Sequence, residues 1–580
     1  MAVIVFLFVI MFLGGAGYLI YYFLSMENQE VIPAFSEQNI NLVIEGDVIT
    51  EKHDPRIVEE EILIPFDTIK KYIDPYIYWD EKARKVTVTT KDRVIRMKTE
   101  NLTAMVNNEP MELNIPVIED GGVIYIPIEF LSDFYNIEVS YLRENNVIII
   151  DFKNSVVQQA GLIDEKAVIR SGRSRRYPIV KKFDAGVVND ETLRVFEEYD
   201  EWYKVRASDG TIGYIEKRFV VIKRIFVNKL PEMESGNNAW KPEDGKINLV
   251  WEQVYSKRID VSAISKMEGL DVVSPTWFQV ENEHGKLINR ADAKYVEWAH
   301  SNGYKVWALL ANNFSDSAMT KKLLNSTDAR ENLIRELLAY AALYKLDGIN
   351  IDFENVDKED KDVLTQFVRE AAPLLREQGL VVSIDINLHP CYDRKALAEA
   401  VDYVMIMAYD QHWKGGGKAG SVAQLVWVES IIKEFLKTIP RDKFILGIPL
   451  YTRLWTEEVN GEGGISLSSK ALSMEDARKV VEENNAEVLW DEESGQFYAE
   501  FKDGKLTHKI WMEDVNSINL KSSLVHKYRL AGAASWSRNF AIPQVWEVFN
   551  RNLKLTMDYY EWKEQNSNIK YVYDNSNSIG

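Results

Sequence analysis

Strand-like apolar runs alternate with amphipathic helical stretches throughout the C-terminal half of this chain of 580 residues. The apolar runs occupy residues 247–254, 270–280, 305–312, 346–355, 381–387, 403–410, 444–451 and 532–539. Between them, stretches such as 329–345 and 359–379 repeat apolar residues every three or four positions, which is the period of a helix. Because each such helix returns the chain to the same end of the sheet, the strands run parallel. Eight of them predict an α/β fold, a closed (β/α)8 TIM barrel.

The alternation breaks once, from residue 453 to about residue 507. Residues 490–504 read WDEESGQFYAEFKDG, which is typical of two short antiparallel strands joined by a turn. We therefore expect a small α+β insertion between strands seven and eight of the barrel. Barrel enzymes place their chemistry at the C-terminal ends of the strands, so the functional side chains are expected there.

Residues 347–355, DGINIDFEN, alternate polar and apolar side chains. With a period of two, Asn350, Asp352 and Glu354 point to one face of the strand and the apolar residues between them to the other. On an edge strand such acids would simply face solvent. Here long amphipathic helices flank the strand, which places the acids in a barrel interior, where charge must be paired or functional. Asp352 and Glu354 lie about 7 Å apart by strand rise. Asp352 is therefore expected to raise the pKa of Glu354 and keep it protonated as a general acid.

This segment resembles the D-G-x-D-x-D-x-E signature of glycoside hydrolase family 18, the chitinases and endo-N-acetylglucosaminidases. The sequence Met407-Ala408-Tyr409-Asp410, the sequence GIPLYTRLW at 447–455 and Trp536 are similar to the same family, so the resemblance spans roughly residues 247–552. Asn350 is a departure, because it stands where the first of three alternating acids is expected. This variant is associated with the branch that acts on bacterial spore cortex and cell wall, and it puts proton sharing between the first two acids in doubt.

The resemblance implies substrate-assisted retaining hydrolysis of a polymer that contains N-acetylhexosamine. Glu354 would protonate the glycosidic oxygen while the acetamido carbonyl of the substrate attacks the anomeric carbon. Asp352 would orient the acetamido group and stabilise the oxazolinium charge. Tyr409 would bond the attacking carbonyl, and Asp410 would hold the sugar. The candidates for substrate binding are Asn350, Trp536, Tyr451, Arg453, Trp277 and Trp251.

The same chemistry needs no cofactor and no metal ion. The chain has seven histidines, in none of the spacings typical of a metal site, and one cysteine, Cys391. Its formal charge of −20, with 89 acidic against 69 basic residues, also argues against a nucleic-acid partner, because binding to phosphates requires clustered Lys and Arg. The expected partner is therefore a polysaccharide of the N-acetylhexosamine type.

Two small modules are expected before the catalytic domain, which we place at residues 225–555 and follow with a tail at 556–580. Residues 62–90 and 124–151 form a weak internal repeat with Ile-x-Ile-Pro at its start, within a segment, 26–155, that resembles the N-terminal stalk domain of copper amine oxidases. It has no His cluster that could hold copper.

The second module, residues 160–224, is similar to a bacterial Src-homology-3-type barrel. It carries Trp202-Tyr203-x-Val205, Gly213-Tyr214-Ile215, and Asp209-Gly210 as a hairpin turn. Its aromatic side chains suit core packing as well as ligand binding. Because this family commonly accompanies wall-degrading domains, the resemblance implies that the small modules bind cell-wall glycan or peptide.

Residues 2–24 contain no charged side chain and are long enough to cross about 30 Å of hydrocarbon as a helix. Residues 25–50 hold acids but no Lys or Arg, which favours the non-cytoplasmic side. We expect a transmembrane anchor at 1–25 with the catalytic domain outside the cell, on a bacterial surface or in a spore envelope. A cleaved signal peptide is the alternative, although its apolar region would be shorter and would follow Lys or Arg.

The sequence thus predicts a membrane-bound O-glycosyl hydrolase that cleaves β-1,4 bonds next to N-acetylglucosamine, in peptidoglycan, spore cortex or chitin. The alternative is a surface protein that binds glycan without cleaving it, because family 18 includes lectin-like members that have lost the acid. Glu354 is present, which favours catalysis.

Overall fold

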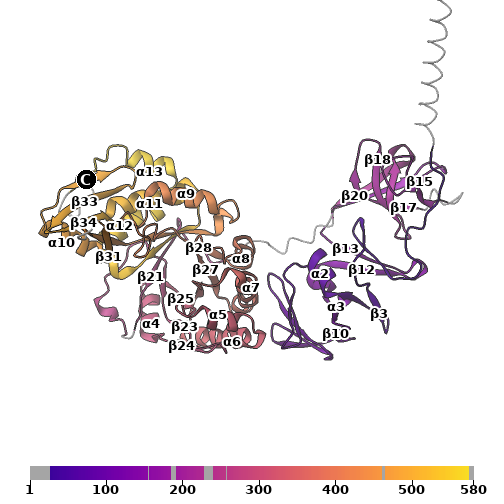
Figure 1. Ribbon diagram of the computed structural model, residues 1–580, viewed down its shortest axis with the longest axis horizontal. Helices are drawn as coiled ribbons and strands as arrows, with labels where there is room; N and C mark the ends of the chain where they lie inside the picture. Colours follow the sequence, from indigo (N-terminus) through magenta and orange to yellow (C-terminus); the bar gives the residue numbers. More distant parts are fainter. Residues whose placement is uncertain are drawn as a thin grey trace, which may run out of the picture. The chain divides into compact units, whose positions relative to one another are not determined.

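The structure is a computed structural model that describes residues 27–154, 156–183, 191–227, 239–255, 258–459 and 464–573 (Figure 1). The described residues form two compact units. One lies within Met1–Ile77 and Arg96–Gly236, and the other within Tyr78–Ile95 and Asn237–Gly580. The predicted membrane span at 2–24 lies outside the described residues. Among the described helices, none combines the length and the apolar character needed to cross a bilayer.

Eight parallel strands close into a barrel in the second unit (Figure 1). In chain order they are β21 (Ile247–Glu252), β22 (Val272–Pro275), β25 (Lys305–Ala311), β26 (Gly348–Asp352), β27 (Val381–Ile386), β28 (Tyr403–Met407), β29 (Phe444–Pro449) and β35 (Gly532–Trp536). Each strand pairs with the next in parallel, and β35 pairs with β21, which closes the ring. These strands lie in the eight predicted runs, and the TIM barrel is confirmed.

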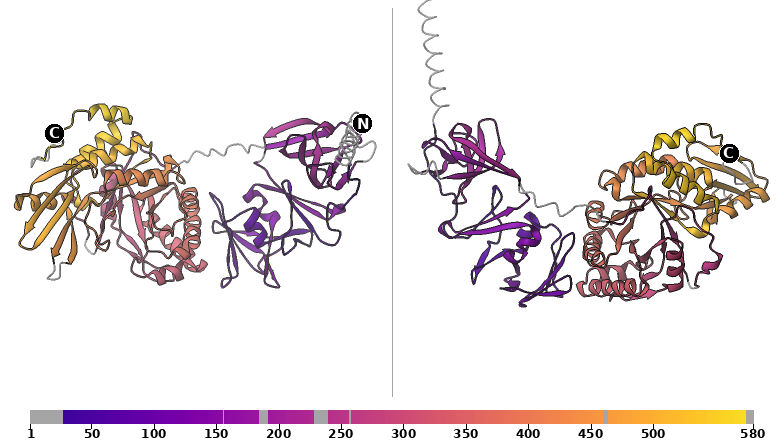
Figure 2. Two further views of the ribbon diagram at one scale, coloured as in Figure 1. Left: turned by 45° about the horizontal axis from the view of Figure 1, so that its top comes forward. Right: turned by 180° about the vertical axis from the view of Figure 1, so that it is seen from behind.

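Helices between the strands cover the outside of the barrel (Figure 2). They are α4 (Ala293–Ser301), α5 (Ser317–Leu324), α6 (Thr327–Tyr344), α7 (Lys361–Glu377), α8 (Arg394–Ala400), α9 (Leu425–Phe435), α11 (Val515–Lys527) and α12 (Gln544–Asn550). Several begin where an Asp or Ser side chain accepts a first-turn backbone N–H, as Ser326 does for α6 and Asp514 for α11. Their apolar faces pack on the outward side chains of the strands. Phe353, which follows β26, stacks on Phe367 of α7 with 5.2 Å between ring centroids.

An antiparallel insertion separates β29 from α11 and β35. It consists of β30 (Tyr451–Val459), β31 (Ile465–Ser473), α10 (Met474–Glu483), β32 (Val488–Asp491), β33 (Gln496–Asp503) and β34 (Leu506–Met512). The strands form a five-stranded sheet in the order β31-β30-β34-β33-β32. Residues of α10 and this sheet share a small core that includes Val481, Phe497 and Ile510. The insertion is thus an α+β element at the position that the sequence predicts.

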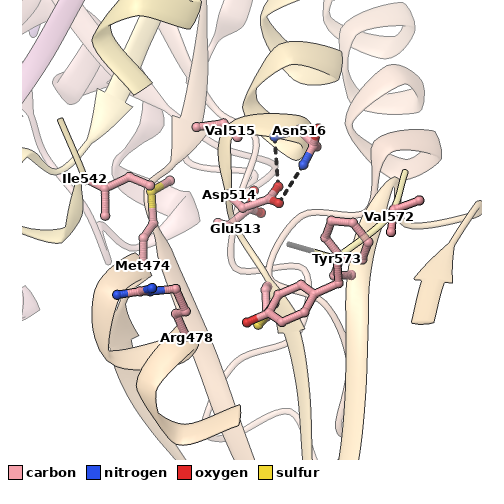
Figure 3. A pocket seen from close by; sticks show the side chains of 11 residues that line it. Met474, Arg478, Glu513, Asp514, Val515, Asn516, Ile542, Val572 and Tyr573 are labelled. Atoms are coloured by element: carbon pink, nitrogen blue, oxygen red, sulfur yellow. Dashed lines mark hydrogen bonds between the residues drawn. The ribbon is translucent and has the colours of Figure 1, made fainter. Parts of the chain in front are cut away.

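The segment after the barrel folds back onto this insertion. In α13 (Tyr559–Gln565), buried Trp562 donates its indole N–H to Asn519 Oδ1 at 3.1 Å. Tyr571 then stacks on Trp490 of β32 with 3.8 Å between ring centroids, and Tyr573 packs edge-on against Phe497 at 5.5 Å. Figure 3 shows Tyr573 beside side chains of α10 and the start of α11. Together they line a small pocket of about 30 Å³. In the described part of the predicted tail, α13 therefore packs on α11, and Tyr571 and Tyr573 pack on the insertion.

The first unit begins with the repeated segment. One sheet contains β12 (Ile137–Leu142), β13 (Val147–Phe152), β1 (Asn41–Ile44) and β2 (Asp47–Ile49), and another contains β10 (Ile118–Asp120), β11 (Val123–Pro127), β4 (Glu61–Pro65) and β3 (Arg56–Val58). Strands β4 and β11 are the two Ile-x-Ile-Pro copies, and they pair with each other. Each runs straight into a short helix, α2 (Phe66–Tyr72) or α3 (Ile128–Tyr135). The sequence repeat is thus a structural repeat.

A seven-stranded antiparallel sheet also lies in this unit. Its order is β16 (Ile179–Lys182), β15 (Val168–Arg170), β19 (Ile212–Glu216), β18 (Trp202–Arg206), β17 (Thr192–Glu198), β14 (Val156–Leu162) and β20 (Val220–Val227). The predicted turn at Gly210 joins β18 to β19 with a positive φ of 88°, which glycine tolerates. Arg206 of this sheet pairs with Asp151 of β13 at 2.5 Å, so the two small modules share a charged interface within the unit.

We expect the packed C-terminal segment to contribute to the stability of the insertion. Tyr571→Ala combined with Tyr573→Ala should lower the free energy of unfolding by about 2 kcal/mol, because two aromatic pairs are lost along with their buried area. Urea denaturation followed by the fluorescence of Trp490 and its neighbours measures this. Tyr560→Ala, at a side chain that is 83% exposed, is the control and should change stability by less than about 0.5 kcal/mol. Equal effects of both changes would contradict the expectation.

Candidate active site

A cleft of about 730 Å³ opens where the barrel strands end. Residues at or just after the ends of β26, β27, β28 and β35 line it, together with the first residues of β30. The sequence-predicted residues that it brings together are Trp251, Asp352, Glu354, Tyr409, Asp410, Tyr451, Arg453 and Trp536. Asn350 lies just beneath, fully buried, where it contacts Trp251. Eight of the ten predicted side chains therefore line the cleft, and Asn350 supports it from below.

Trp277 is the exception. It is 1% exposed, packs edge-on against Tyr295 of α4 with 5.5 Å between centroids, and belongs to the barrel core. The structure does not bring this predicted substrate-binding residue to the cleft, because its indole faces the helices outside the barrel.

The backbone at the end of β26 is held by side chains from neighbouring strands. Asn312, one residue beyond β25, accepts the backbone N–H of Glu354 and donates to its carbonyl oxygen, both at 2.9 Å. Tyr392 donates its hydroxyl to the carbonyl oxygen of Phe353 at 2.8 Å. These bonds fix the direction in which the Glu354 side chain leaves the strand. Nothing in the sequence pattern singled out Asn312 or Tyr392.

Burial and like charge act on both acids of β26. The pKa of Glu354 is raised, first by burial and then by the charge of Asp410. The pKa of Asp352 is raised well above its usual value by burial, and then by the charges of Glu354 and Asp385. The direction predicted for Glu354 agrees with the structure, and Asp410 is an additional acid that contributes to it. The repulsion between Asp352 and Glu354 disfavours charge on both at once.

Asp410 is held from one side of the cleft. Tyr451 donates its hydroxyl to Asp410 Oδ1 at 2.6 Å, and Arg453 donates to the same oxygen at 3.2 Å. The backbone of Asp410 is left-handed, with φ of 57°, a conformation that aspartate adopts more readily than most residues. Both partners lie at the start of β30, the first strand of the insertion, so the insertion orients a residue of the barrel.

Tyr409 enters the cleft as a neutral hydroxyl. Burial raises its pKa well above the usual value, and the charges of Asp385, Glu354 and other neighbours raise it further. Its ring lies edge-on to Tyr451 with 6.4 Å between centroids. A phenol that keeps its proton can donate a hydrogen bond to a carbonyl oxygen.

Aromatic and apolar side chains provide surface for a sugar ring. Half-buried Trp536 lies against buried Trp251 with 5.9 Å between centroids. Phe314, Leu388 and Trp413 also line the cleft and are 40%, 50% and 54% exposed. Exposed apolar side chains that gather at a cleft mark a binding surface. The sequence pattern did not identify these three, because they lie in loops without periodicity.

Among the described residues, no group of three or more His, Cys, Asp or Glu side chains is arranged to hold a metal ion. The acids of the cleft face aromatic rings and one another instead. Their arrangement suits proton transfer and the stabilisation of positive charge.

A parallel barrel whose cleft holds buried acids beside aromatic side chains suits a glycosidase. Residues 256–541 match Glycosyl hydrolases family 18, residues 43–150 match the Copper amine oxidase N-terminal domain, and residues 166–221 match the Bacterial SH3 domain. The chain is therefore a glycosyl hydrolase with a family 18 domain that follows two small N-terminal domains.

Relatives of the catalytic domain come from bacteria and animals. An uncharacterized glycosylase of Bacillus subtilis (strain 168), YvbX, is 23% identical over 47% of this chain and 82% of its own length. The cortical fragment-lytic enzyme of the same bacterium is 28% identical over 40% of this chain, and the chain spans 56% of that enzyme. Human di-N-acetylchitobiase is 25% identical over 46% of this chain and 76% of its length. A solved structure, the Bacillus megaterium spore cortex-lytic enzyme SleL, is 22% identical over 58% of this chain and 78% of that chain, with a TM-score of 0.49.

The bonds to Asn312 should matter for catalysis although Asn312 does not face the cleft. Asn312→Ala removes both bonds to the backbone of Glu354, and we expect turnover to fall by about 10- to 100-fold because the carboxyl group is displaced. The control is Asn313→Ala, since the side chain of Asn313 bonds only within its own loop, to Ser315. Steady-state hydrolysis of a soluble oligosaccharide compares the two variants, and equal losses would contradict a role in placing Glu354.

Proposed function

We propose that the barrel cleaves β-1,4 glycosidic bonds next to N-acetylglucosamine by substrate-assisted retaining hydrolysis. The observation that supports this most directly is Glu354, a carboxyl group with a raised pKa that opens into a cleft beside Asp352 and Tyr409. A raised pKa keeps the proton that a general acid must donate. Because Glu354 has kept this carboxyl group, catalysis is favoured over binding alone.

In this proposal Glu354 gives its proton to the glycosidic oxygen as the bond to the anomeric carbon breaks. The acetamido carbonyl of the sugar attacks that carbon, and an oxazolinium ion forms. Water then opens the ion with Glu354, now a carboxylate, as the base, so the configuration at the anomeric carbon is retained.

Asp352 and Tyr409 would act on the acetamido group. Asp352 would accept its N–H and, as a carboxylate, balance the positive charge that spreads over the ring of the intermediate. Tyr409, with its proton retained, would donate to the carbonyl oxygen. Asp410, held by Tyr451 and Arg453, would bond the sugar hydroxyls, and Trp536 would stack under the ring.

The family of the second module supports a cell-wall substrate. Bacterial SH3 domains suggest attachment to the cell wall, and one relative is called a cortical fragment-lytic enzyme. We place the enzyme at the cell wall or spore envelope, with peptidoglycan or spore cortex preferred over chitin. We further propose that residues 2–24 anchor it in the membrane.

Product analysis tests the reaction. The enzyme is incubated with peptidoglycan, spore cortex and chitin, and mass spectrometry of the soluble products identifies which polymer is cut and at which sugar. Glu354→Gln keeps the shape but removes the acid, and turnover should fall by about 100- to 10,000-fold with binding retained. The control is Glu359→Gln, at an exposed acid five residues away. Full activity of Glu354→Gln, or a sugar trapped on a carboxylate, would exclude this mechanism.

The pH profile tests the electrostatics. An acid that must be protonated loses activity as pH rises through its pKa, and the charge of Asp410 raises the pKa of Glu354. Asp410→Asn should therefore move the basic limb of kcat/KM to lower pH, besides lowering the rate. Asp442→Asn changes an exposed acid outside the cleft and should leave the limb in place. A basic limb that stays unchanged in Asp410→Asn would contradict the assignment of Glu354 as the acid.

A further inference from the structure

Asp385 of β27 is a buried carboxyl group in the cleft that the reaction as proposed above does not use. It is 1% exposed and lines the cleft beside Asp352 and Glu354. Burial raises its pKa well above the usual value. Among the described residues, no Lys or Arg forms an ion pair with it. A buried acid without a countercharge costs stability, so its presence calls for a function.

The strand register places Asp385 beside Asp352. In the parallel pair β26–β27, Asn350 is opposite Ser383 and Ile351 is opposite Ile384. One step further along, Asp352 and Asp385 occupy neighbouring positions on strands spaced about 4.8 Å apart. Both side chains follow the inward face of the barrel, so two carboxyl groups lie next to each other.

Asn350 determines which of the two carries the charge. Its Oδ1 accepts the indole N–H of Trp251 at 2.9 Å and the hydroxyl of Ser274 at 3.2 Å, which fixes the orientation of the amide. The amide nitrogen therefore points the other way and donates to Asp385 Oδ1 at 2.8 Å. A hydrogen bond from a donor favours the ionised form of a carboxyl group. Asp352 lacks such support, because its buried Oδ1 has no hydrogen-bond partner.

We propose that Asp385 is a positioning residue for the hydrolysis: in the free enzyme it holds the negative charge while Asp352 holds a proton, and it takes that proton when the acetamido group of the substrate reaches Asp352. The O–H bond of Asp352 breaks as an O–H bond forms on Asp385, so the total charge of the pair does not change. Asp352 is then the carboxylate that faces the oxazolinium ion, and the proton returns after hydrolysis. This role rests on the proposed function.

No cation in the cleft is placed to change this distribution. The other titratable and charged side chains that line the cleft or face the pair are Glu354 after β26, His389 and Tyr392 after β27, Tyr409, Asp410 and Lys414 after β28, and Tyr451 and Arg453 of β30. Burial keeps Tyr392 and Tyr409 neutral by raising the pKa of each well above its usual value. Arg453 is engaged by Asp410. The remaining carboxylate, Asp410, adds negative charge on the same side of the barrel, while Glu354 keeps its proton as the general acid.

The proposal also explains why Asn350 can replace an acid. With an acid at position 350, the proton would be shared along one strand. Here position 350 holds an amide, and the acid that shares the proton with Asp352 is Asp385 on the next strand. One hydrogen bond of 2.8 Å joins Asn350 to Asp385.

Asp385→Asn tests the role by pH profile. It removes the partner that accepts the proton of Asp352, so Asp352 must ionise alone in a buried site without the hydrogen bond that Asn350 gives to Asp385. Because Asp352 must be ionised to face the oxazolinium ion, the acidic limb of kcat should move to higher pH. The maximal rate should fall by about 10- to 100-fold with little change in KM, since Asp352 has lost the acceptor for its proton. A merely structural role would lower the rate without moving the limb.

The exchange Asn350→Asp combined with Asp385→Asn is the sharper experiment. It keeps one amide, one carboxyl group and the hydrogen bond between them. The double variant should therefore be at least tenfold more active than Asp385→Asn. The acidic limb should move back toward that of the wild type. Circular dichroism checks that all variants fold.

The role of Asp385 is excluded if Asp385→Asn keeps the wild-type limb, or if the exchange is no more active than the single change. Different results would exclude the proposed function: wild type would hydrolyse none of the three polymers, or hydrolysis would not depend on Glu354. The two failures are therefore distinguishable in one set of assays.

Discussion

The two-residue period of β26 is the constraint on which the catalytic unit depends. Along one strand it sends Ile351 and Phe353 outward to the helices and Asn350 and Asp352 inward. The outward side chains hold the barrel together, as Phe353 does by stacking on Phe367. The inward ones meet where the strand ends, together with side chains from the neighbouring strands. Core and active site are thus opposite faces of the same backbone, and a shift of register by one residue would exchange them.

The sequence predicts β26 and its inward-facing acids because the pattern that identifies them lies within one short segment. The period of two and the helices on either side place β26 in a barrel, and both can be read within about thirty residues. The same holds for the turn at Gly210, whereas the pairing of the two repeated Ile-x-Ile-Pro strands is known only from the structure. Tyr409 and Asp410 are predicted from the resemblance to family 18, and their place just after β28 agrees with the rule that barrel enzymes act at the strand ends. Each of these inferences needs only the pattern of one segment.

The residues that sequence reasoning missed act across strands. Asp385 sits in VVSIDIN, a run that looks like any buried strand, and its place beside Asp352 depends on the register between β26 and β27. Asn312 ends another apolar run and reaches Glu354 only through the pairing of β25 with β26. Trp277 shows the opposite error. Its position after β22 suggested the cleft, but the local turn directs it to α4, and a single sequence does not reveal that turn.

The buried acids outside the cleft show what is unusual about those within it. Glu370 pairs with Arg330 at 2.8 Å and Glu513 with Lys521 at 2.5 Å, so each of these two buried carboxylates has a buried cation. Among the described residues Asp352 and Asp385 have no such cation, and burial raises the pKa of each well above its usual value. A carboxyl group whose pKa is higher in the folded state stabilises the fold only at low pH, and this contribution is lost as pH rises through the folded value. Near neutral pH the pair therefore weakens the barrel, and the apolar core around β26 must offset that cost. The fold tolerates this because a pair of acids that no cation neutralises can stabilise a cation formed by the substrate.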